Sequence, residues 1–221
     1  MTVPTRSRLI RDSVGVGVAV GAYGTAFGAA SVGAGLSVLQ TSLLSLLAFT
    51  GGTQFAVVGV LAGGGALVSA VSGGLLLGAR NTLYAMRMAP VLGVRGPRRW
   101  LAALGTIDES TAMSVAQPTP ALARLGFWWT FAGVYVFWNA FTLVGALGAS
   151  ALGDTSRYGL DAVVPAAFLA LLAPRLRAGA VERRVGAAAA LIAVVLIPFT
   201  PPGVPVLAAT AALLLASEGR R

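Results

Sequence analysis

A short polar segment interrupts a long apolar stretch near residue 50, and its residue types suit the binding of a carboxylate. The segment contains Thr50, Gly51, Gly52, Thr53 and Gln54. A helix that begins near Thr53 would point free backbone N–H groups, at the positive end of its dipole, toward whatever occupies the gap. In membrane proteins, broken helices of this kind form substrate sites near the bilayer midplane. The other interpretation is a glycine kink satisfied by its neighbours, in which Gln54 bonds an adjacent helix.

Two further polar residues, Arg80 and Asn81, directly follow the next apolar run. The guanidinium of Arg80 could pair with a carboxylate of a substrate or of the protein. Alternatively, it could extend to the water interface, as long cationic side chains do. The short amide of Asn81 cannot reach that interface and needs a nearby partner. We therefore expect both residues to be candidates for substrate binding.

Three acidic residues are candidates for coupling transport to an ion. Asp108 and Glu109 are adjacent, so on a helix their side chains point about 100° apart and do not form a paired-carboxylate site. Burial raises the pKa of a carboxyl group, which would let either residue carry a proton. The alternative is that both are solvated charges that cap a helix and pair with Arg98 or Arg99. Asp161 begins a predicted helix, where an acidic residue is favourable on local grounds alone.

The chain lacks the residue types that most catalytic and metal sites require. It has no His and no Cys, which removes nucleophile–base pairs, disulfides and the commonest ligands of zinc and haem. It also has no Lys, so a phosphate-binding loop of the GxxxxGK type is absent. We therefore expect no enzyme activity, no cofactor and no metal, and we expect any uphill transport to draw on an ion gradient.

Composition places the chain in a membrane. Hydrophobic residues make up 57% of it, charged residues 10%, and the mean hydropathy is +0.83. Soluble domains carry about 25% charged residues. Residues 13–79, 125–153 and 185–217 contain no charge, and one spanning helix needs roughly 20 apolar residues. The net charge of +9 sits in arginine clusters between these runs, which is typical of cytoplasmic loops and argues against nucleic-acid binding.

The N-terminal end predicts a retained first helix. Arg6, Arg8 and Arg11 precede an apolar run that is too long for a signal peptide. We interpret residues 1–12 as a cytoplasmic tail and about Val14 to Leu36 as the first helix. The localisation that follows is the plasma (inner) membrane of a prokaryote.

The first helix carries four glycines on one face. They are Gly17, Gly21, Gly24 and Gly28. Spacings of four, three and four residues place them above one another, and two of the pairs are GxxxG motifs that allow another helix to approach closely. This face predicts either packing within the chain or contact with a second subunit.

The topology between residues 40 and 99 has two solutions. The arginines between residues 80 and 99 should lie on the cytoplasmic side, so an odd number of crossings must separate them from the first helix. The favoured solution makes Gln40 to Leu61 a broken, re-entrant segment, followed by a crossing from Ala66 to about Ala79. The alternative is two full crossings, which would leave five arginines outside.

The remaining sequence predicts three further spans and a closing hairpin. They are a weak span from Trp100 to Gln117, the clearest span from Leu125 to Leu152, a short span from Ala162 to Ala173, and a closing hairpin of Val185 to Ile197 and Val204 to Ala216. The predicted fold is all-α and polytopic, with about seven hydrophobic segments in one domain covering residues 1–221. Its membrane part is 13–217, and 218–221 form a cytoplasmic C-terminus.

Four segments in register resemble the AzlC family, the large subunit of two-component branched-chain amino-acid exporters. They are Leu43 to Phe55 (LLSLLAFTGGTQF), Leu77 to Pro90 (LGARNTLYAMRMAP), Thr106 to Ala112 (TIDESTA) and Tyr158 to Leu172 (YGLDAVVPAAFLALL). The chain departs from the family pattern at Gly78 to Asn81, where the family often has Asn before Arg, and at Ile107, where it often has Thr.

The resemblance implies a secondary exporter of branched-chain amino acids such as valine, leucine and isoleucine, with methionine or analogues also accepted. It also implies a small hydrophobic partner of the AzlD type. Its motifs fall on the residues already marked, namely Gly51, Gly52, Gln54, Arg80, Asn81, Asp108, Glu109 and Asp161. The competing hypothesis is a non-transporting scaffold or accessory subunit that binds a partner through its glycine-rich helix faces.

Overall fold

The protein is an assembly of helices in the part of the chain that the structure describes. The computed structural model describes residues 4–153, 157, 162–201 and 203–214, and within these ranges it contains helices and connecting turns but no β-strand. The predicted all-α class is therefore confirmed. Gly159, Leu160 and Asp161, together with residues 215–221, lie outside the described residues.

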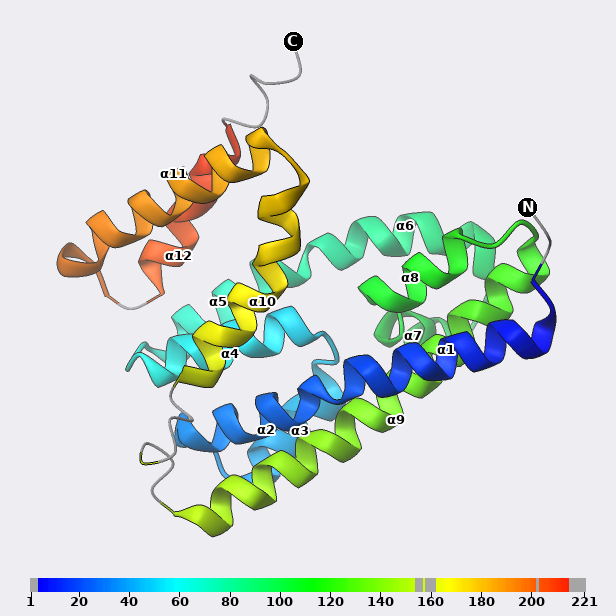
Figure 1. Ribbon diagram of the computed structural model, residues 1–221, viewed down its shortest axis with the longest axis horizontal. Helices are drawn as coiled ribbons and strands as arrows, with labels where there is room; N and C mark the ends of the chain where they lie inside the picture. Colours follow the sequence, from blue (N-terminus) through cyan, green and yellow to red (C-terminus); the bar gives the residue numbers. More distant parts are fainter. Residues whose placement is uncertain (1–3, 154–156, 158–161, 202, 215–221) are drawn as a thin grey trace.

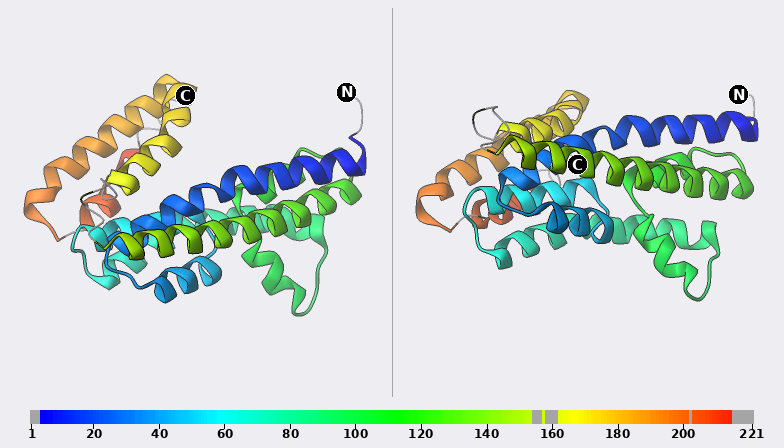
Figure 2. Two further views of the ribbon diagram at one scale, coloured as in Figure 1. Left: turned by 60° about the horizontal axis from the view of Figure 1, so that its bottom comes forward. Right: turned by 90° about the horizontal axis from the view of Figure 1, so that it is seen from below.

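Two long helical segments lie side by side and form the backbone of the fold (Figures 1 and 2). The first consists of α1 (Arg6–Gly21) and α2 (Tyr23–Gly33), which continue almost without interruption. The second is α9 (Pro120–Leu152). They contain 28 and 33 residues and are the two helices of the described chain that are long and apolar enough to cross a membrane. At 1.5 Å per residue they extend roughly 42 and 50 Å.

The two long segments run parallel and touch through small residues. A Cβ atom on Gly17 would lie 2.6 Å from the carbonyl carbon of Gly133, and one on Gly21 would lie 2.5 Å from Cβ of Phe137. Gly24 and Gly28 meet the α9 backbone further along, next to Trp138 and Thr142. The glycine face of the first helix is thus occupied by α9, at a separation that no larger residue permits.

Replacing Gly17 by leucine should strongly destabilise the fold, because its side chain would collide with the backbone of α9. We expect a loss of about 3 kcal/mol, at the upper end of overpacking effects, measured as a lower midpoint of thermal unfolding in detergent. Gly15→Leu is the matched control, since nothing lies within 4 Å of a Cβ there. Equal melting of the two variants would contradict this account of the interface.

The polar segment near residue 50 separates two short helices. The first, α3 (Val38–Leu47), begins with a capping box in which the side chains of Ser37 and Gln40 each bond the other residue's backbone N–H. Residues 48–50 then break the helix, and α4 (Gly51–Ala62) begins. The predicted break is present, but α4 begins at Gly51 rather than near Thr53, so both glycines lie in its first turn.

The chain continues through α5 (Leu67–Gly78) and α6 (Arg80–Leu92), which bring it back toward the N-terminal end of α1 (Figure 1). Pro90 lies in the last turn of α6, and the helix ends where Gly93 takes a left-handed conformation with φ of 61°. α4 and α5 pack against each other along most of their length. Thr53 fills the space above Gly74 and Gly78 at this contact.

The predicted weak span from Trp100 to Gln117 is wrong as a single helix. The structure has α7 (Arg98–Leu104) and α8 (Asp108–Val115), separated by a turn. In that turn Ser110 accepts a hydrogen bond from the Ile107 N–H and donates one to the Gly105 carbonyl. Helices of seven and eight residues extend only about 12 Å, so neither can cross a bilayer.

The C-terminal part forms an arm beside the long helices (Figures 1 and 2). It contains α10 (Val163–Ala178), α11 (Ala180–Leu196), the 3₁₀ helix Ile197–Phe199, α12 (Val204–Ala209) and the 3₁₀ helix Thr210–Leu213. α11 and α12 pack as the predicted hairpin. The arginines at 183 and 184 lie within α11 rather than in a loop. Crossing by the other predicted segments stays a prediction, since two helices of the described residues, α1–α2 and α9, meet the length criterion.

Candidate functional site

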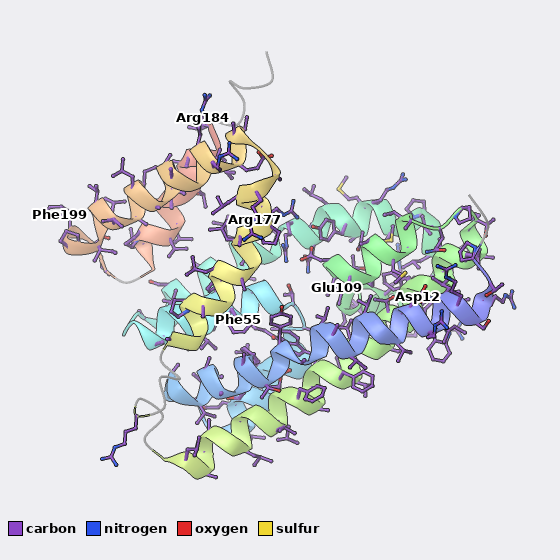
Figure 3. The ribbon with its side chains drawn as sticks, in the orientation of Figure 1. Asp12, Phe55, Glu109, Arg177, Arg184 and Phe199 are labelled. Carbon is purple, nitrogen blue, oxygen red and sulfur yellow. The ribbon has the colours of Figure 1, made fainter. Side chains whose placement is uncertain are left out.

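A cavity of about 470 Å³ lies where α2, α4, α6, α8, α9 and α10 converge. Its volume is within the range of roughly 300–1,000 Å³ that is usual for small-molecule sites. In Figure 3, the labelled Phe55 and Glu109, both of which line the cavity, lie in the middle of the molecule. The polar residues of its wall are Thr50, Gly51, Gly52, Arg80, Asp108, Glu109 and Arg175. The apolar residues are Val20, Tyr23, Phe49, Phe55, Leu77, Ile107, Val134, Trp138, Phe168 and Leu172.

The N-terminal turn of α4 faces this cavity with its backbone. Its N-cap, Thr50, is extended, and no side chain caps the helix. The first N–H groups of an α-helix have no partner inside the helix, and they form the positive end of its dipole. Gly51 and Gly52 leave these groups uncovered on the cavity side. The arrangement is suited to an anion such as a carboxylate.

Gln54 holds the helix break in place. Its side-chain amide is fully buried and donates to the carbonyl oxygens of Ala48 at 3.0 Å and Ser45 at 3.3 Å, at the end of α3. Its carbonyl oxygen accepts a hydrogen bond of 3.0 Å from the indole N–H of Trp138 in α9. One amide therefore satisfies the end of α3 and joins α3, α4 and α9, which fixes where α4 begins.

Replacing Trp138 by phenylalanine should destabilise the protein, because the buried Gln54 carbonyl would lose its donor. An unsatisfied buried polar group costs about 1–3 kcal/mol. The expected result is a lower unfolding midpoint in detergent for Trp138→Phe than for Trp129→Phe. Trp129 lies on the same helix and is 42% exposed, so its replacement is the matched control. If both variants unfold like the wild type, the hydrogen bond between Trp138 and Gln54 does not stabilise the break between α3 and α4.

An ion pair in the cavity wall joins α6 to α8. A terminal nitrogen of Arg80 lies 2.8 Å from a carboxylate oxygen of Asp108, with both side chains about 40% exposed. Tyr84, one turn further along α6, faces the same carboxylate, which raises the pKa of its phenol. The Nε of Arg80 is buried without a hydrogen-bond partner among the described residues, so this guanidinium retains donor capacity.

Glu109 follows Asp108 on α8 and also lines the cavity, but it forms no ion pair with any of the described residues. The short helix α8 lies outside the two spanning helices. Burial is the main cause that raises the pKa of the Glu109 carboxyl, and the neighbouring Asp108 adds to the shift while Arg80 opposes it. A carboxyl group in this setting takes up a proton more readily than an exposed glutamate.

The cavity thus combines opposite charges with an apolar surface. Donors from the start of α4, Arg80 and Arg175 can bind a carboxylate, and the carboxylates of α8 can bind an ammonium group. The ring of Phe55 contacts those of Phe168 and Trp138, with ring centroids 6.1 and 6.4 Å apart. Chemically, the site can hold a zwitterion that carries an aliphatic side chain.

The structure brings together five of the nine predicted substrate and ion residues. Gly51, Gly52, Arg80, Asp108 and Glu109 line the cavity. Three of the others, Thr53, Gln54 and Asn81, do not appear in its wall. Gln54 lies behind it, Thr53 packs against α5, Asn81 has a buried carbonyl oxygen without a partner among the described residues, and Asp161 lies outside them. The four predicted packing glycines face α9.

Several residues of the cavity were not predicted from the sequence. Phe49, Phe55, Phe168 and Trp138 look like ordinary core aromatics, and Arg175 resembles a loop arginine. One signal was available for Trp138: an indole N–H inside an apolar span needs a hydrogen-bond acceptor, and Gln54 is the buried amide that supplies it. No local pattern marks Arg175, whose place depends on how α10 packs against α4.

The fold and the cavity define a helical membrane protein with an internal polar site, and relatives support that class. A protein of Archaeoglobus fulgidus named "Uncharacterized membrane protein" is 31% identical over 195 residues, which cover 87% of this chain and 86% of that protein. A Haemophilus influenzae protein with the same name is 24% identical over 176 residues, or 78% of this chain and 68% of that protein. No solved structure matches the chain.

The AzlC protein family profile matches residues 15–152, which include both long helical segments, the helix break and the charged cavity residues of α6 and α8. The chain belongs to the AzlC family. The family is associated with transport and is known as one subunit of a two-component system.

Proposed function

We propose that this protein exports branched-chain amino acids across the plasma membrane as the large subunit of a two-component secondary transporter. The observation that carries the proposal is the cavity, which is partly open and brings together carboxylate-binding groups, ammonium-binding groups and apolar rings. Valine, leucine and isoleucine have these three features, and methionine or analogues of similar shape would fit the same description. The small partner would be of the AzlD type.

The substrate carboxylate would bind the start of α4. Gly51 and Gly52 present backbone N–H groups there, and a terminal nitrogen of Arg80 lies 3.5 Å from the position of a Cβ on Gly52. The helix terminus and the guanidinium therefore point at the same volume. The substrate ammonium would bind Glu109 on the opposite helix, because Asp108 is already paired with Arg80. The aliphatic side chain would then pack among the aromatic rings.

The membrane arrangement that supports this function has a cytoplasmic N-terminus and about seven segments. α1–α2 and α9 run parallel, so both would cross from the cytoplasm outward. α3 and α4 would form the re-entrant segment, with the break at residues 48–50 near the midplane. Non-helical backbone survives at that depth only where it lines a cavity or contacts protein, and Thr50 does line the cavity.

Export would be driven by protons entering through the site. Glu109 is the leading carrier because it lines the cavity without an ion-pair partner among the described residues, whereas Asp108 is paired. Asp161 stays a candidate from the sequence alone. Protonation of Glu109 would release the substrate ammonium, and deprotonation would restore the binding site.

The proposal is tested by expressing the chain, with and without an AzlD-type partner, in cells loaded with valine-containing dipeptides. We expect the cells that express the transporter to retain less intracellular valine and to release more into the medium. Unchanged retention and release in both strains would overturn the proposal. Glutamate-containing dipeptides serve as a control, because a second carboxylate has no place among the aromatic rings.

The scaffold hypothesis is less well supported. It assigned the glycine faces of the first helix to a partner, but Gly17, Gly21, Gly24 and Gly28 all contact α9 of the same chain. A partner that binds this protein must use another surface.

A further inference from the structure

The helix α8 connects two cavities. Its first residues, Asp108 and Glu109, line the central cavity. Met113 and the residues that follow α8, Ala116 and Gln117, line a second cavity of about 430 Å³ against the N-terminal end of α1. Glu109 and Gln117 are eight residues apart, which corresponds to about 12 Å along a helix. The two cavities are therefore close neighbours, separated by the middle of α8.

The region between the two cavities contains buried hydroxyl groups that have no hydrogen-bond partner within the described part of the chain. On α8 these are Thr111 and Ser114, which are 9% and 1% exposed. The carbonyl oxygen of Gln117 is likewise buried and unpartnered among the described residues. Buried polar groups in proteins are nearly always bonded, either to protein or to an internal water molecule. Three such groups on α8 and the residues that directly follow it are unusual for a dry helix contact.

The two long helices, α1–α2 and α9, add a second pair of buried, unpartnered groups close to their contact with α8. A Cβ on Gly126 of α9 would lie 3.1 Å from Met113 and 3.6 Å from Leu9, so α1, α8 and α9 meet there. One turn further along the parallel helices lie Ser13 and Thr130, both fully buried and both without a partner. Val134, one more turn along α9, lines the central cavity. Unpartnered groups thus lie both on α8 and at the contact of α1 with α9, in the part of the fold between the two cavities.

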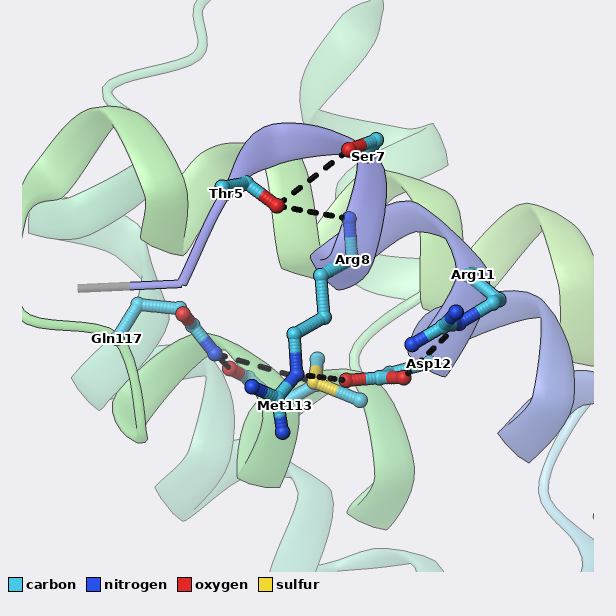
Figure 4. A network of polar contacts seen from close by, with 7 residues as sticks. All are labelled: Thr5, Ser7, Arg8, Arg11, Asp12, Met113 and Gln117. Carbon is cyan, nitrogen blue, oxygen red and sulfur yellow. Dashed lines mark hydrogen bonds and ion pairs between the residues drawn. The ribbon is translucent and has the colours of Figure 1, made fainter. Parts of the chain in front are cut away.

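Charged groups are present at both ends of this polar region. At the second cavity, Asp12 lies 3.8 Å from both Arg8 and Arg11, and Figure 4 shows this cluster beside Gln117 and Met113. At the central cavity, Asp108, Arg80 and Arg175 line the wall together with Glu109. Between these ends the polar residues are neutral hydroxyls and one amide, which can pass a proton along water but cannot bind an ion tightly.

We propose that a file of water molecules runs along α8, from Glu109 to the cavity at the N-terminal end of α1, and that protons taken up by Glu109 leave through it toward the side of the N-terminus. The oxygens of Gln117, Ser114, Ser13, Thr130 and Thr111 would hold the water. The proton-carrying part rests on the proposed proton-coupled export. The water file itself does not, because it follows from the buried groups alone.

The test uses the absence of cysteine from the chain. Ser13→Cys and Ser114→Cys are introduced singly into the full chain in membranes, which are then treated with aminoethyl methanethiosulfonate, and modification is followed by mass spectrometry. Methanethiosulfonates react with thiolates, which form in contact with water. Ser31→Cys and Ser45→Cys are matched controls, since both serines are fully buried but their hydroxyls bond Thr41 and Thr142.

We expect Ser13→Cys and Ser114→Cys to react at least tenfold faster than the two controls. Equal, slow reaction of all four variants would overturn the water file whether or not the protein exports amino acids. In proteoliposomes, Ser114→Val should then lower the proton uptake that accompanies leucine efflux. Fast labelling with unchanged proton uptake would overturn the proton route. Absence of leucine efflux from the wild type would instead contradict the proposed function.

Discussion

Replacing Arg80 by glutamine is expected to lower leucine efflux roughly tenfold or more, while the amount of protein in the membrane stays close to that of the wild type. The guanidinium is the cationic group nearest the start of α4, and its terminal nitrogen also bonds Asp108 at 2.8 Å. Glutamine keeps hydrogen-bonding capacity but loses the charge. Loss of a charge–charge contact in a partly enclosed site commonly weakens binding by tenfold or more.

Arg87→Gln is the matched control for this prediction, because Arg87 lies on the same helix with its side chain exposed. Efflux from proteoliposomes with a range of internal leucine concentrations separates the two possible effects. A higher apparent KM is expected if Arg80 holds the substrate carboxylate. Normal efflux by Arg80→Gln would show that the ion pair with Asp108 has no part in substrate binding.

Replacing Glu109 by glutamine should uncouple export from the proton gradient. In the wild type, burial raises the pKa of Glu109, so the carboxyl group is protonated on the acidic side and ionises as the pH rises through that pKa. Acid outside should therefore accelerate efflux by the wild type. The glutamine variant is neutral at every pH, so its remaining efflux should not respond to the gradient, and exchange of leucine for leucine should weaken because glutamine also lacks the charge that binds the substrate ammonium.

Glu182→Gln, an exposed change on α11, provides the control and should retain the full response to the gradient. The measurement is efflux at equal and unequal pH across the membrane, with exchange measured in parallel. A Glu109→Gln protein that still responds to acid outside would assign proton coupling to another group.

The sequence predicted the features of the fold that depend on local chemistry. Charge-free runs indicate helices in a membrane, and two of these runs correspond to the long helical segments. The glycine spacing of the first helix indicates a face for close packing, and that face meets α9. The polar residues near 50 indicate a break in a helix, and α3 and α4 are separated there. Each of these follows from residue spacing over a few turns.

The features that the sequence could not predict depend on contacts between distant segments. Gln54 and Trp138 are 84 residues apart, and Arg80 and Asp108 are 28 apart, so no local pattern could pair them. Hydropathy suggested one weak span from Trp100 to Gln117, because averaging along the chain hides the turn that Ser110 stabilises. The cavity's aromatic residues and Arg175 could not be predicted for the same reason, because their positions depend on contacts between distant segments.

The central claim is that the cavity binds the whole zwitterion of an aliphatic amino acid and moves it across the membrane. The most direct measurement is efflux of labelled leucine from proteoliposomes that contain the chain and its partner, in competition with unlabelled compounds. Leucine should compete strongly, whereas leucinamide, without a carboxylate, and N-acetyl-leucine, without an ammonium group, should each compete at least tenfold less well. Equal competition by all three, or no efflux above that of protein-free liposomes, would contradict the account.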